Sequence, residues 1–264
     1  MNHVEFNIPI LDWPSDAGGA NRVQVDSSDP RFRDPLVRLS EVGVASESFY
    51  ARTDKRNSPY NMRIEGSLSQ VWCRGLVAKM LQKANALLWQ YDTEIFVWDG
   101  YRPIETQLGL WSFFWNKSLE LMPTATAEQR RAWMLRYVSD PEHFSPVDST
   151  SWPAHSTGGA VDLTLRSRST HQLLDMGSAF DEMTELSHSD ALERMFRDGK
   201  IDEDVPALRH RRLLHWAMQR SGFANYPFEF WHFDWGNQMY VKHFEILGRP
   251  VGKSAWFGYA ESPV

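Results

Sequence analysis

Residues 155–165 read HSTGGAVDLTL, and this short stretch contains a chain reversal followed by a strand. Gly158 and Gly159 permit the positive φ angles that a tight reversal needs. After the glycines the residues alternate with the period of a strand that has two unlike faces. One face carries Ala160, Asp162 and Thr164, and the other carries Val161, Leu163 and Leu165. The stretch therefore predicts a strand that buries its apolar face, with His155 folded back over the turn towards Asp162.

The segments on either side mix helices and strands without a regular β-α-β rhythm. Apolar residues recur every three or four positions from Ser67 to Tyr91, which predicts a long helix with Ser67 as its N-cap. Residues 94–98 (EIFVW) predict a buried strand. We expect further helices at about 104–120, 126–138, 182–197 and 206–220, and a strand or turn at 228–233. This mixture predicts an α+β fold with a small, largely antiparallel sheet flanked by helices.

The 264 residues are enough for one domain with a core of its own. Residues 1–66 are rich in turn-forming residues, which predicts a loop-rich wrapping segment with one or two short strands. The periodic segments occupy residues 67–236, and a C-terminal tail fills residues 237–264. We expect these three parts to form a single domain over residues 1–264.

The composition excludes several classes of protein. The 28 basic and 34 acidic residues give a net charge of −6, without the basic excess typical of nucleic-acid binding. The single Cys73 excludes an internal disulfide, a sulfur-ligated zinc site and an iron–sulfur cluster. The longest apolar run, residues 108–115, is shorter than the ~18 residues of a membrane span. Residues 1–10 lack the basic and apolar regions of a secretory signal, so we expect a cytoplasmic protein.

The histidines offer the best candidates for chemistry. His155 precedes Asp162 by seven residues, and Glu229 precedes His232 by three. On a flat strand Glu229 and His232 would point to opposite faces, so a bulge or turn is needed to bring both to one site. Two histidines and one aspartate leave an open coordination position, as catalytic zinc sites do. A zinc ion would acidify a bound water, and a carboxylate such as Glu229 can then take the proton and return it to a leaving amine.

A cation near such a metal would stabilise the charge that develops on a tetrahedral intermediate. Arg102 is the candidate, because it lies in the turn DGYRP (residues 99–103) directly after the buried strand. An alternative interpretation is a structural ion pair between Arg102 and Asp99.

Four blocks of the sequence together resemble the VanX-type D-alanyl-D-alanine dipeptidases of zinc peptidase family M15. These blocks are DGYRP (99–103), HSTGGAVDLTL (155–165), MGSAFD (176–181) and EFWH (229–232), and they follow the order found in that family. The resemblance implies a compact α+β fold shared with D,D-carboxypeptidases and hedgehog-like domains. It also implies one Zn²⁺ per chain, a small dipeptide as substrate, and roles for individual residues. These roles are zinc ligation by His155, Asp162 and His232, general-base catalysis by Glu229, and transition-state stabilisation by Arg102.

Contacts to the substrate are less clearly specified. The resemblance implies that Asp181 anchors the free amine of the dipeptide, although an ordinary helix N-cap is an alternative. The family commonly has two serines before the first histidine, where this chain has Pro153 and Ala154. The family's N-terminal substrate tyrosine corresponds to either Tyr50 or Tyr60. The tryptophans nearest the expected site, Trp152, Trp231 and Trp235, are candidates for the pocket wall.

The remaining features receive simpler interpretations. We expect His188 to be structural or to support a ligand, and residues 209–212 (RHRR) to form a solvated helix face.

The leading hypothesis is zinc-dependent hydrolysis of a small dipeptide, with D-alanyl-D-alanine first. The same chemistry on another dipeptide or a peptidoglycan fragment is an alternative, because the two serines are missing. Two histidines and one aspartate also form the facial triad of non-haem iron oxygenases, although their carboxylate usually follows the first histidine by two residues. A non-catalytic binding module that keeps the site as a relic is a third hypothesis, and a homo-oligomer is compatible with all of them.

Overall fold

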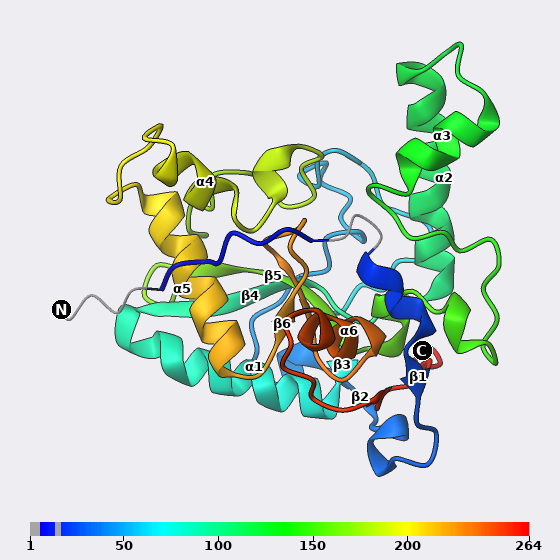
Figure 1. Ribbon diagram of the computed structural model, residues 1–264, viewed down its shortest axis with the longest axis horizontal. Helices are drawn as coiled ribbons and strands as arrows, with labels where there is room; N and C mark the ends of the chain where they lie inside the picture. Colours follow the sequence, from blue (N-terminus) through cyan, green and yellow to red (C-terminus); the bar gives the residue numbers. More distant parts are fainter. Residues whose placement is uncertain (1–5, 14–16, 264) are drawn as a thin grey trace.

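A four-stranded antiparallel sheet lies at the centre of the computed structural model, which describes residues 6–13 and 17–263 (Figure 1). Its strand order is β4 (Thr93–Asp99), β5 (Ala160–Ser167), β7 (His232–Asp234) and β6 (Ala224–Asn225). Each neighbouring pair of strands is antiparallel. The expected α+β class, with a small antiparallel sheet and flanking helices, is confirmed.

The strands separate two hydrophobic cores because their side chains alternate between the faces. Ile95 and Val97 of β4 join the larger core, whereas Phe96 and Trp98 join an aromatic core on the opposite side. The larger core also contains Val161, Leu163 and Leu165, which confirms the apolar face predicted for β5. Asp162 belongs to the other face and remains free to enter a polar site.

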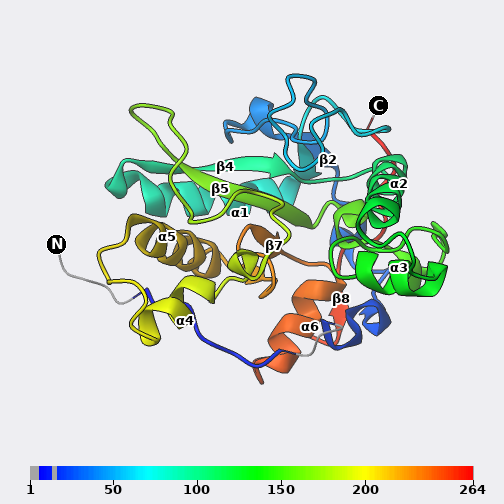
Figure 2. The same cartoon turned by 90° about the horizontal axis from the view of Figure 1, so that it is seen from above.

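The helices cover these cores in two groups. Helices α1 (Gly75–Leu88) and α5 (Pro206–Arg220) pack against the sheet and bury apolar side chains in the larger core. Helices α2 (Ile104–Leu121) and α3 (Ala127–Met134) lie side by side at one end of the sheet and cover the aromatic core (Figure 2).

Segments near the two ends of the chain lie against each other. Strand β1 (Gln24–Val25) pairs in parallel with β8 (Ser254–Ala255), and the short helix η1 (Ala17–Arg22) packs against α6 (Gln238–Ile246). A further two-stranded antiparallel sheet pairs β2 (Leu36–Arg38) with β3 (Trp72–Arg74). The N-terminal segment therefore wraps the body of the protein, with two short strands as expected. The tail beyond residue 237 is more regular than expected, since it contains α6 and β8.

The remaining short elements complete the path of the chain. Helix α4 is Ala191–Arg197, and the 3₁₀ helices not named above or in the site are η2 (Pro30–Arg33), η3 (Leu39–Val42), η4 (Trp89–Tyr91) and η7 (Glu185–Ser187). Among the described residues, no helix combines the length and the apolar character needed to cross a membrane. The expectation of a cytoplasmic protein rests partly on residues 1–5, which lie outside the described residues.

The predicted helix from Ser67 to Tyr91 is wrong at its start. Residues 72–74 pair with β2 as strand β3, and the helix begins only at Gly75. The hydroxyl of Ser67 donates hydrogen bonds to the carbonyls of Ile64 and Tyr50 and caps no helix. Pairing with β2 satisfies the backbone hydrogen bonds of residues 72–74. The local apolar periodicity could not reveal this distant partner.

Two other predicted elements are shorter than expected. The helix at 126–138 is α3, Ala127–Met134, and the helix at 182–197 is only α4 preceded by η7. The strand or turn expected at 228–233 is both, because a turn through residues 227–231 leads into β7, His232–Asp234.

The expectation of a solvated face at residues 209–212 is wrong. Arg211 is 1% exposed and donates hydrogen bonds to the carbonyls of Met176, Leu186 and His188. Arg212 is also buried, against Glu193. Arg211 therefore holds the segment 176–188 to α5, and Arg212 holds α4 to it.

Candidate metal centre and active site

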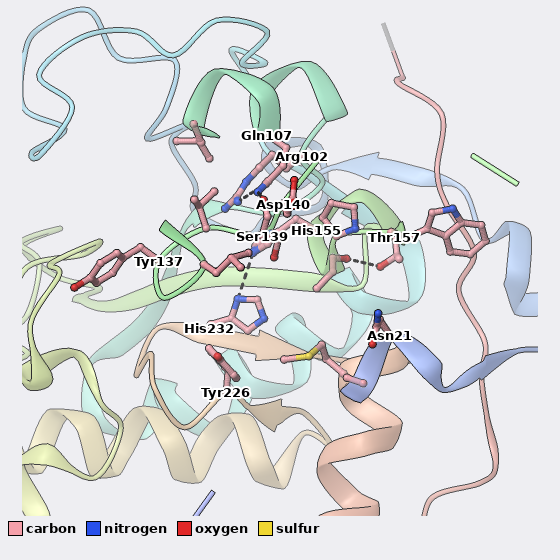
Figure 3. Close-up of a pocket in the computed structure, with 18 of the residues that line it drawn as sticks. Asn21, Arg102, Gln107, Tyr137, Ser139, Asp140, His155, Thr157, Tyr226 and His232 are labelled. Atoms are coloured by element: carbon pink, nitrogen blue, oxygen red, sulfur yellow. Dashed lines mark hydrogen bonds between the residues drawn. The ribbon is translucent and has the colours of Figure 1, made fainter. Parts of the chain in front are cut away.

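Three predicted ligand residues from three separate segments meet where the inner strands β5 and β7 pair, and Figure 3 shows two of them, His155 and His232. His155 lies in the short helix η6 (Ala154–Thr157), and Gly158 follows it with a φ of 70°, which reverses the chain into β5. Asp162 of β5 and His232 of β7 are register partners across neighbouring strands. His232 Nδ1 lies 3.0 Å from Asp162 Oδ1, and His155 Nε2 lies 3.4 Å from Asp162 Oδ2. The prediction that the chain doubles back over the glycines is therefore confirmed.

The two imidazoles are oriented by hydrogen bonds on their outer nitrogen atoms. His155 Nδ1 lies 2.7 Å from the carbonyl oxygen of Gly100, which can only accept, so Nδ1 carries the proton. His232 Nε2 lies 3.1 Å from the carboxylate of Asp234, which fixes the proton on Nε2 in the same way. The inner nitrogen atoms, His155 Nε2 and His232 Nδ1, then face each other as lone pairs at 3.3 Å.

This arrangement of donors fits a metal ion. Two inward lone pairs and a carboxylate at close range repel one another unless a cation lies between them. Ligand atoms about 2.0–2.1 Å from a tetrahedral zinc ion lie ~3.3 Å apart. The two inner nitrogen atoms lie 3.3 Å apart, and each lies 3.0 or 3.4 Å from one of the two oxygen atoms of Asp162. With one ligand atom taken from each residue, the three atoms lie within 4.8 Å of one another, close enough to share one ion. The neutral imidazoles and the carboxylate are also ligand types that zinc accepts.

The charges of this cluster hold Asp162 ionised. Burial alone would raise the pKa of Asp162, but the neighbouring imidazoles of His155 and His232 outweigh burial and hold that pKa well below its usual range. Burial would lower the pKa of His232, but the Asp234 and Asp162 carboxylates raise it well above its ordinary value. The site therefore supplies strong local negative charge for a cation.

Glu229 reaches the cluster through a tight turn, as the sequence required. The amide of Glu229 donates to the carbonyl of Tyr226, and the amide of His232 donates to the carbonyl of Glu229. The side-chain amide of Asn225 holds this turn by donating to the carbonyls of both Glu229 and His232, at 3.1 and 2.9 Å. Glu229 Oε2 consequently lies 3.9 Å from His232 Nδ1. Burial raises the pKa of Glu229 to about 8, so this carboxyl group binds a proton tightly.

Arg102 is held on the other side of the cluster by several partners. Its Nε donates to Asp99 at 2.8 Å and its Nη1 donates to Gln107 at 2.9 Å. Its Nη2 faces the Tyr50 hydroxyl at 3.3 Å and Asp162 Oδ2 at 3.4 Å. Both interpretations of Arg102 thus find support, because an ion pair with Asp99 aims the guanidinium at the metal-ligand cluster.

Asp181 forms a separate acidic point near the same arginine. Its Oδ2 accepts hydrogen bonds from the hydroxyls of Tyr50 and Tyr60, at 2.9 and 3.0 Å. Burial and the charge of Asp162 raise the pKa of Asp181 to about 6. Asp181 has a φ of 60° and precedes no helix directly, so the N-cap interpretation is wrong. Both candidates for the substrate tyrosine, Tyr50 and Tyr60, therefore contact the same oxygen atom of Asp181.

These groups line one cavity of about 650 Å³. Its lining includes His155, Asp162, His232, Glu229 and Arg102, together with Asp181, Trp152 and both Tyr50 and Tyr60. Figure 3 shows His155 and His232 in the middle of this cavity, with Tyr137 on one side and Asn21 and Thr157 on the other.

The other tryptophan candidates lie elsewhere. Trp231 is 3% exposed, packs in the larger core and lines an adjoining cavity of about 400 Å³ that shares Asp181 and Glu229 with the first. Trp235 packs against the core and lines neither cavity. His188 lines the adjoining cavity and makes an edge-to-face contact with Phe228, apart from the metal-ligand cluster.

Sequence reasoning missed the residues that orient the ligands. Asp234 carried a usable signal, because it lies two residues after His232 and shares its face of a strand. The carbonyl of Gly100 carried none, since it meets His155 from fifty-five residues away in the chain. Asn225 lies only four and seven residues before the carbonyls that it holds, but no recognised motif marks it.

Comparisons with known proteins agree with this geometry. Residues 73–247 match the sequence profile of a peptidase family described as D-ala-D-ala dipeptidase. The chain is similar to a D-alanyl-D-alanine dipeptidase of Escherichia coli, with 32% identity over 58% of this chain and 61% of that relative. It is 28% identical to a D-alanyl-D-alanine dipeptidase of Synechocystis over 70% of this chain and 77% of the relative. A dipeptidase of the same name from Enterococcus faecium is 31% identical over 60% of this chain and 69% of the relative.

Proposed function

Because the chain belongs to the peptidase M15 family of D-alanyl-D-alanine dipeptidases, we propose that it hydrolyses a small dipeptide by zinc-dependent chemistry, with D-alanyl-D-alanine as the first candidate. Membership in this family makes the chain a dipeptidase enzyme. One observation supports the proposed mechanism above others. The inner nitrogen atoms of His155 and His232 converge with Asp162 in a cavity that Glu229 and Arg102 also line.

The ligand residues prepare the site before any substrate binds. His155, Asp162 and His232 would hold one zinc ion per chain, with Gly100 and Asp234 fixing the two imidazoles. Zinc held there would acidify a water molecule and polarise the scissile carbonyl. The protein's own contribution is a rigid donor set whose geometry needs no rearrangement on binding.

Glu229 carries the proton in both halves of the reaction. As a carboxylate it accepts a proton from the attacking water, whose oxygen forms the new bond to the carbonyl carbon. It then returns that proton to the nitrogen of the leaving amino acid as the C–N bond breaks. The pKa of about 8 that burial gives this group supports the second step, because the protonated form survives at neutral pH.

Arg102 acts on the carbonyl oxygen of the reacting amide, and Asp181 acts on the free amine of the dipeptide. The Arg102 guanidinium, held by Asp99 and Gln107, stabilises negative charge on the carbonyl oxygen. Asp181 binds the free amine of the dipeptide, with Tyr50 and Tyr60 fixing its carboxylate. We propose that Trp152 contacts the leaving residue and that Trp231 contacts the first residue through the adjoining cavity.

Two broader proposals accompany this mechanism. The pairing of β1 with β8 supports a single domain over residues 1–264. A cytoplasmic location is also proposed.

The same chemistry on another amide is a second candidate. Pro153 and Ala154 line the cavity where the family's two serines would offer hydroxyls to the substrate. A panel of dipeptides and peptidoglycan fragments decides between the two. Activity confined to substrates other than D-alanyl-D-alanine supports the second candidate.

The test of the mechanism is Glu229→Ala, with the exposed Glu120→Ala as matched control. We expect Glu229→Ala to retain zinc and to lose about 10²–10⁴-fold in kcat. The control should keep both zinc and turnover. Unchanged turnover in Glu229→Ala rejects the proposed base. Bound iron in place of zinc revives the oxygenase hypothesis, and absence of turnover on the whole panel supports a non-catalytic module.

A further inference from the structure

We infer that the leaving-group side of the cavity accepts a bulky side chain without negative charge, so that the preferred substrates are D-alanyl dipeptides with a large C-terminal residue. This inference rests on the proposed function, because it uses Asp181 as the amine anchor. It extends that function from the chemistry of the amide to the class of residue that leaves.

The position of Asp181 gives the direction of a bound dipeptide. Asp181 and Tyr137 both line the cavity that adjoins the main one, so they mark the same end of the main cavity. Figure 3 places Tyr137 on one side of the two histidines and Asn21 with Thr157 on the other. A dipeptide whose amine binds Asp181 and whose carbonyl lies at the metal-ligand cluster therefore sends its second residue towards Asn21.

Three segments far apart in the sequence build the wall at that end. They are η1 with Asn21, η5 (Ser149–Ser151) with its neighbour Trp152, and the start of α6 with Gln238. Asn21 ties them together, since its side-chain amide donates to the carbonyl of Thr150 at 3.2 Å and its own carbonyl accepts from Gln238 at 3.0 Å. The wall is thus a fixed surface that stands away from the metal-ligand cluster.

The chemistry of this wall disfavours an acidic occupant. The side-chain amides of Asn21, Gln238 and Asn237 each already donate within the protein, and the carboxylate of Asp148, the N-cap of η5, lines the same cavity. The Trp152 indole N–H also has an internal acceptor, the carbonyl of Ser145 at 2.9 Å. The surfaces that remain for contact include the apolar side chains of Ala20, Trp152 and Met239.

The cationic side chains of the cavity lie away from this wall. Among the described lining residues the only arginines are Arg102 and Arg136, and no lysine is present. Arg102 is bound at the metal-ligand cluster, and Arg136 also lines the adjoining cavity at the Asp181 end. An acidic side chain on the leaving residue would therefore find no arginine or lysine at the Asn21 wall.

The size of the cavity also favours a bulky leaving residue. Its volume of about 650 Å³ falls within the ~300–1,000 Å³ of pockets that enclose drug-sized ligands. Alanyl-alanine is among the smallest dipeptides and would leave most of that space to water. Residues 20 and 21 also lie outside the matched segment 73–247, so part of this wall comes from a region that the family profile does not cover.

The experiment compares dipeptides that share an N-terminal D-alanine and end in D-alanine, D-leucine or D-phenylalanine. We expect kcat/KM of the zinc-loaded enzyme to be about tenfold or more higher for D-phenylalanine than for D-alanine, the scale of a hydrophobic pocket's discrimination. The variant Asn21→Trp, which fills the space, should lower this preference ratio about tenfold. Met239→Ala, which enlarges the space beside the same wall, should keep the preference for D-phenylalanine.

The outcomes separate this inference from the proposed function. A preference for D-alanyl-D-alanine in the wild-type enzyme overturns the inference and leaves the proposed function standing. A preference ratio that Asn21→Trp does not change overturns the location of the pocket. Absence of hydrolysis across the series, with zinc bound, counts against the proposed function itself.

Discussion

The histidine pair His155 and His232 differs from the pair His215 and His243 in its charge surroundings. His155 and His232 are buried and lie within 3.0–3.5 Å of the carboxylates Asp99, Asp162 and Asp234. His215 is buried and His243 is half-buried, and both line another cavity, of about 260 Å³.

The second pair lacks carboxylate contacts of this kind. Within the described part of the chain, neither His215 nor His243 makes an ion pair with an acidic side chain. Burial lowers the pKa of each to about 4. Burial by itself therefore keeps a histidine neutral, and only the added carboxylates make the first pair attractive to a cation.

The largest expected effect separates the two pairs by metal binding. His232→Ala removes a ligand, so we expect zinc affinity to fall by more than ~100-fold, beyond the loss typical of supporting residues. Activity should be lost with the metal. His215→Leu, the matched change in the other pair, should keep zinc and turnover. Equal loss of zinc in both variants, measured by metal analysis after dialysis, contradicts the comparison.

The next largest effect is on the stability of the folded protein in acid, and it involves His215 of the second pair. The folded-state pKa of His215 is about 4 against ~6.5 in an unfolded chain, so the unfolded state binds more protons below pH 6.5. The free energy of unfolding should therefore fall as pH decreases from 6.5 to 4, by up to about 3 kcal/mol for this one group.

Urea unfolding of the metal-free protein across this pH range provides the measurement. His215→Leu should show a flatter dependence than the wild type, because it carries no proton there. Parallel curves for the two proteins would remove His215 as a cause.

A smaller effect tests the carboxylates around the first pair. Asp234→Asn removes the charge that fixes His232, so we expect zinc affinity to fall about 10–100-fold. Asp198→Asn is the control, since Asp198 pairs with Arg197 and Lys200 far from the cavity. If Asp234→Asn binds zinc as tightly as the control does, the proposed role of the Asp234 carboxylate is rejected.

The smallest effect is expected for a histidine that lies near a carboxylate but is exposed to solvent. His171 is 67% exposed and lies 4.0 Å from Glu94. We choose His171→Asn because the residue has a φ of 58°, a region that asparagine tolerates. The change should shift the free energy of unfolding by less than about 0.5 kcal/mol and leave zinc binding intact. A larger shift in thermal or urea unfolding would show that exposure does not weaken this pair.

Local patterns predicted much of the fold. The alternation in residues 160–165 assigned each side chain to its face, and strand 94–98 and helix 206–220 were found close to their observed bounds. Local patterns failed where a distant segment took over. Residues 72–74 continue a helical apolar spacing, yet they pair with residues 36–38 as a strand. Arg211 lies in a basic run, yet the carbonyls of a loop about 25–35 residues earlier surround it.

The sequence alone determined which donors are available. One cysteine left imidazole and carboxylate as the ligand types, and the two glycines before Ala160 allowed His155 to return over Asp162. These are properties of composition and of neighbouring residues, and they need no knowledge of distant contacts.

The tertiary structure decided which histidines can share a cation. Register pairing of β5 with β7 places His232 beside Asp162, seventy residues away in the chain. The carbonyl of Gly100 and the carboxylate of Asp234 then turn both lone pairs inward. The size and polarity of the leaving-group wall were decided in the same way, because η1, η5 and α6 meet only in the folded chain. Electrostatic attraction and hydrogen bonding depend on distance in space, and sequence separation carries little information about that distance.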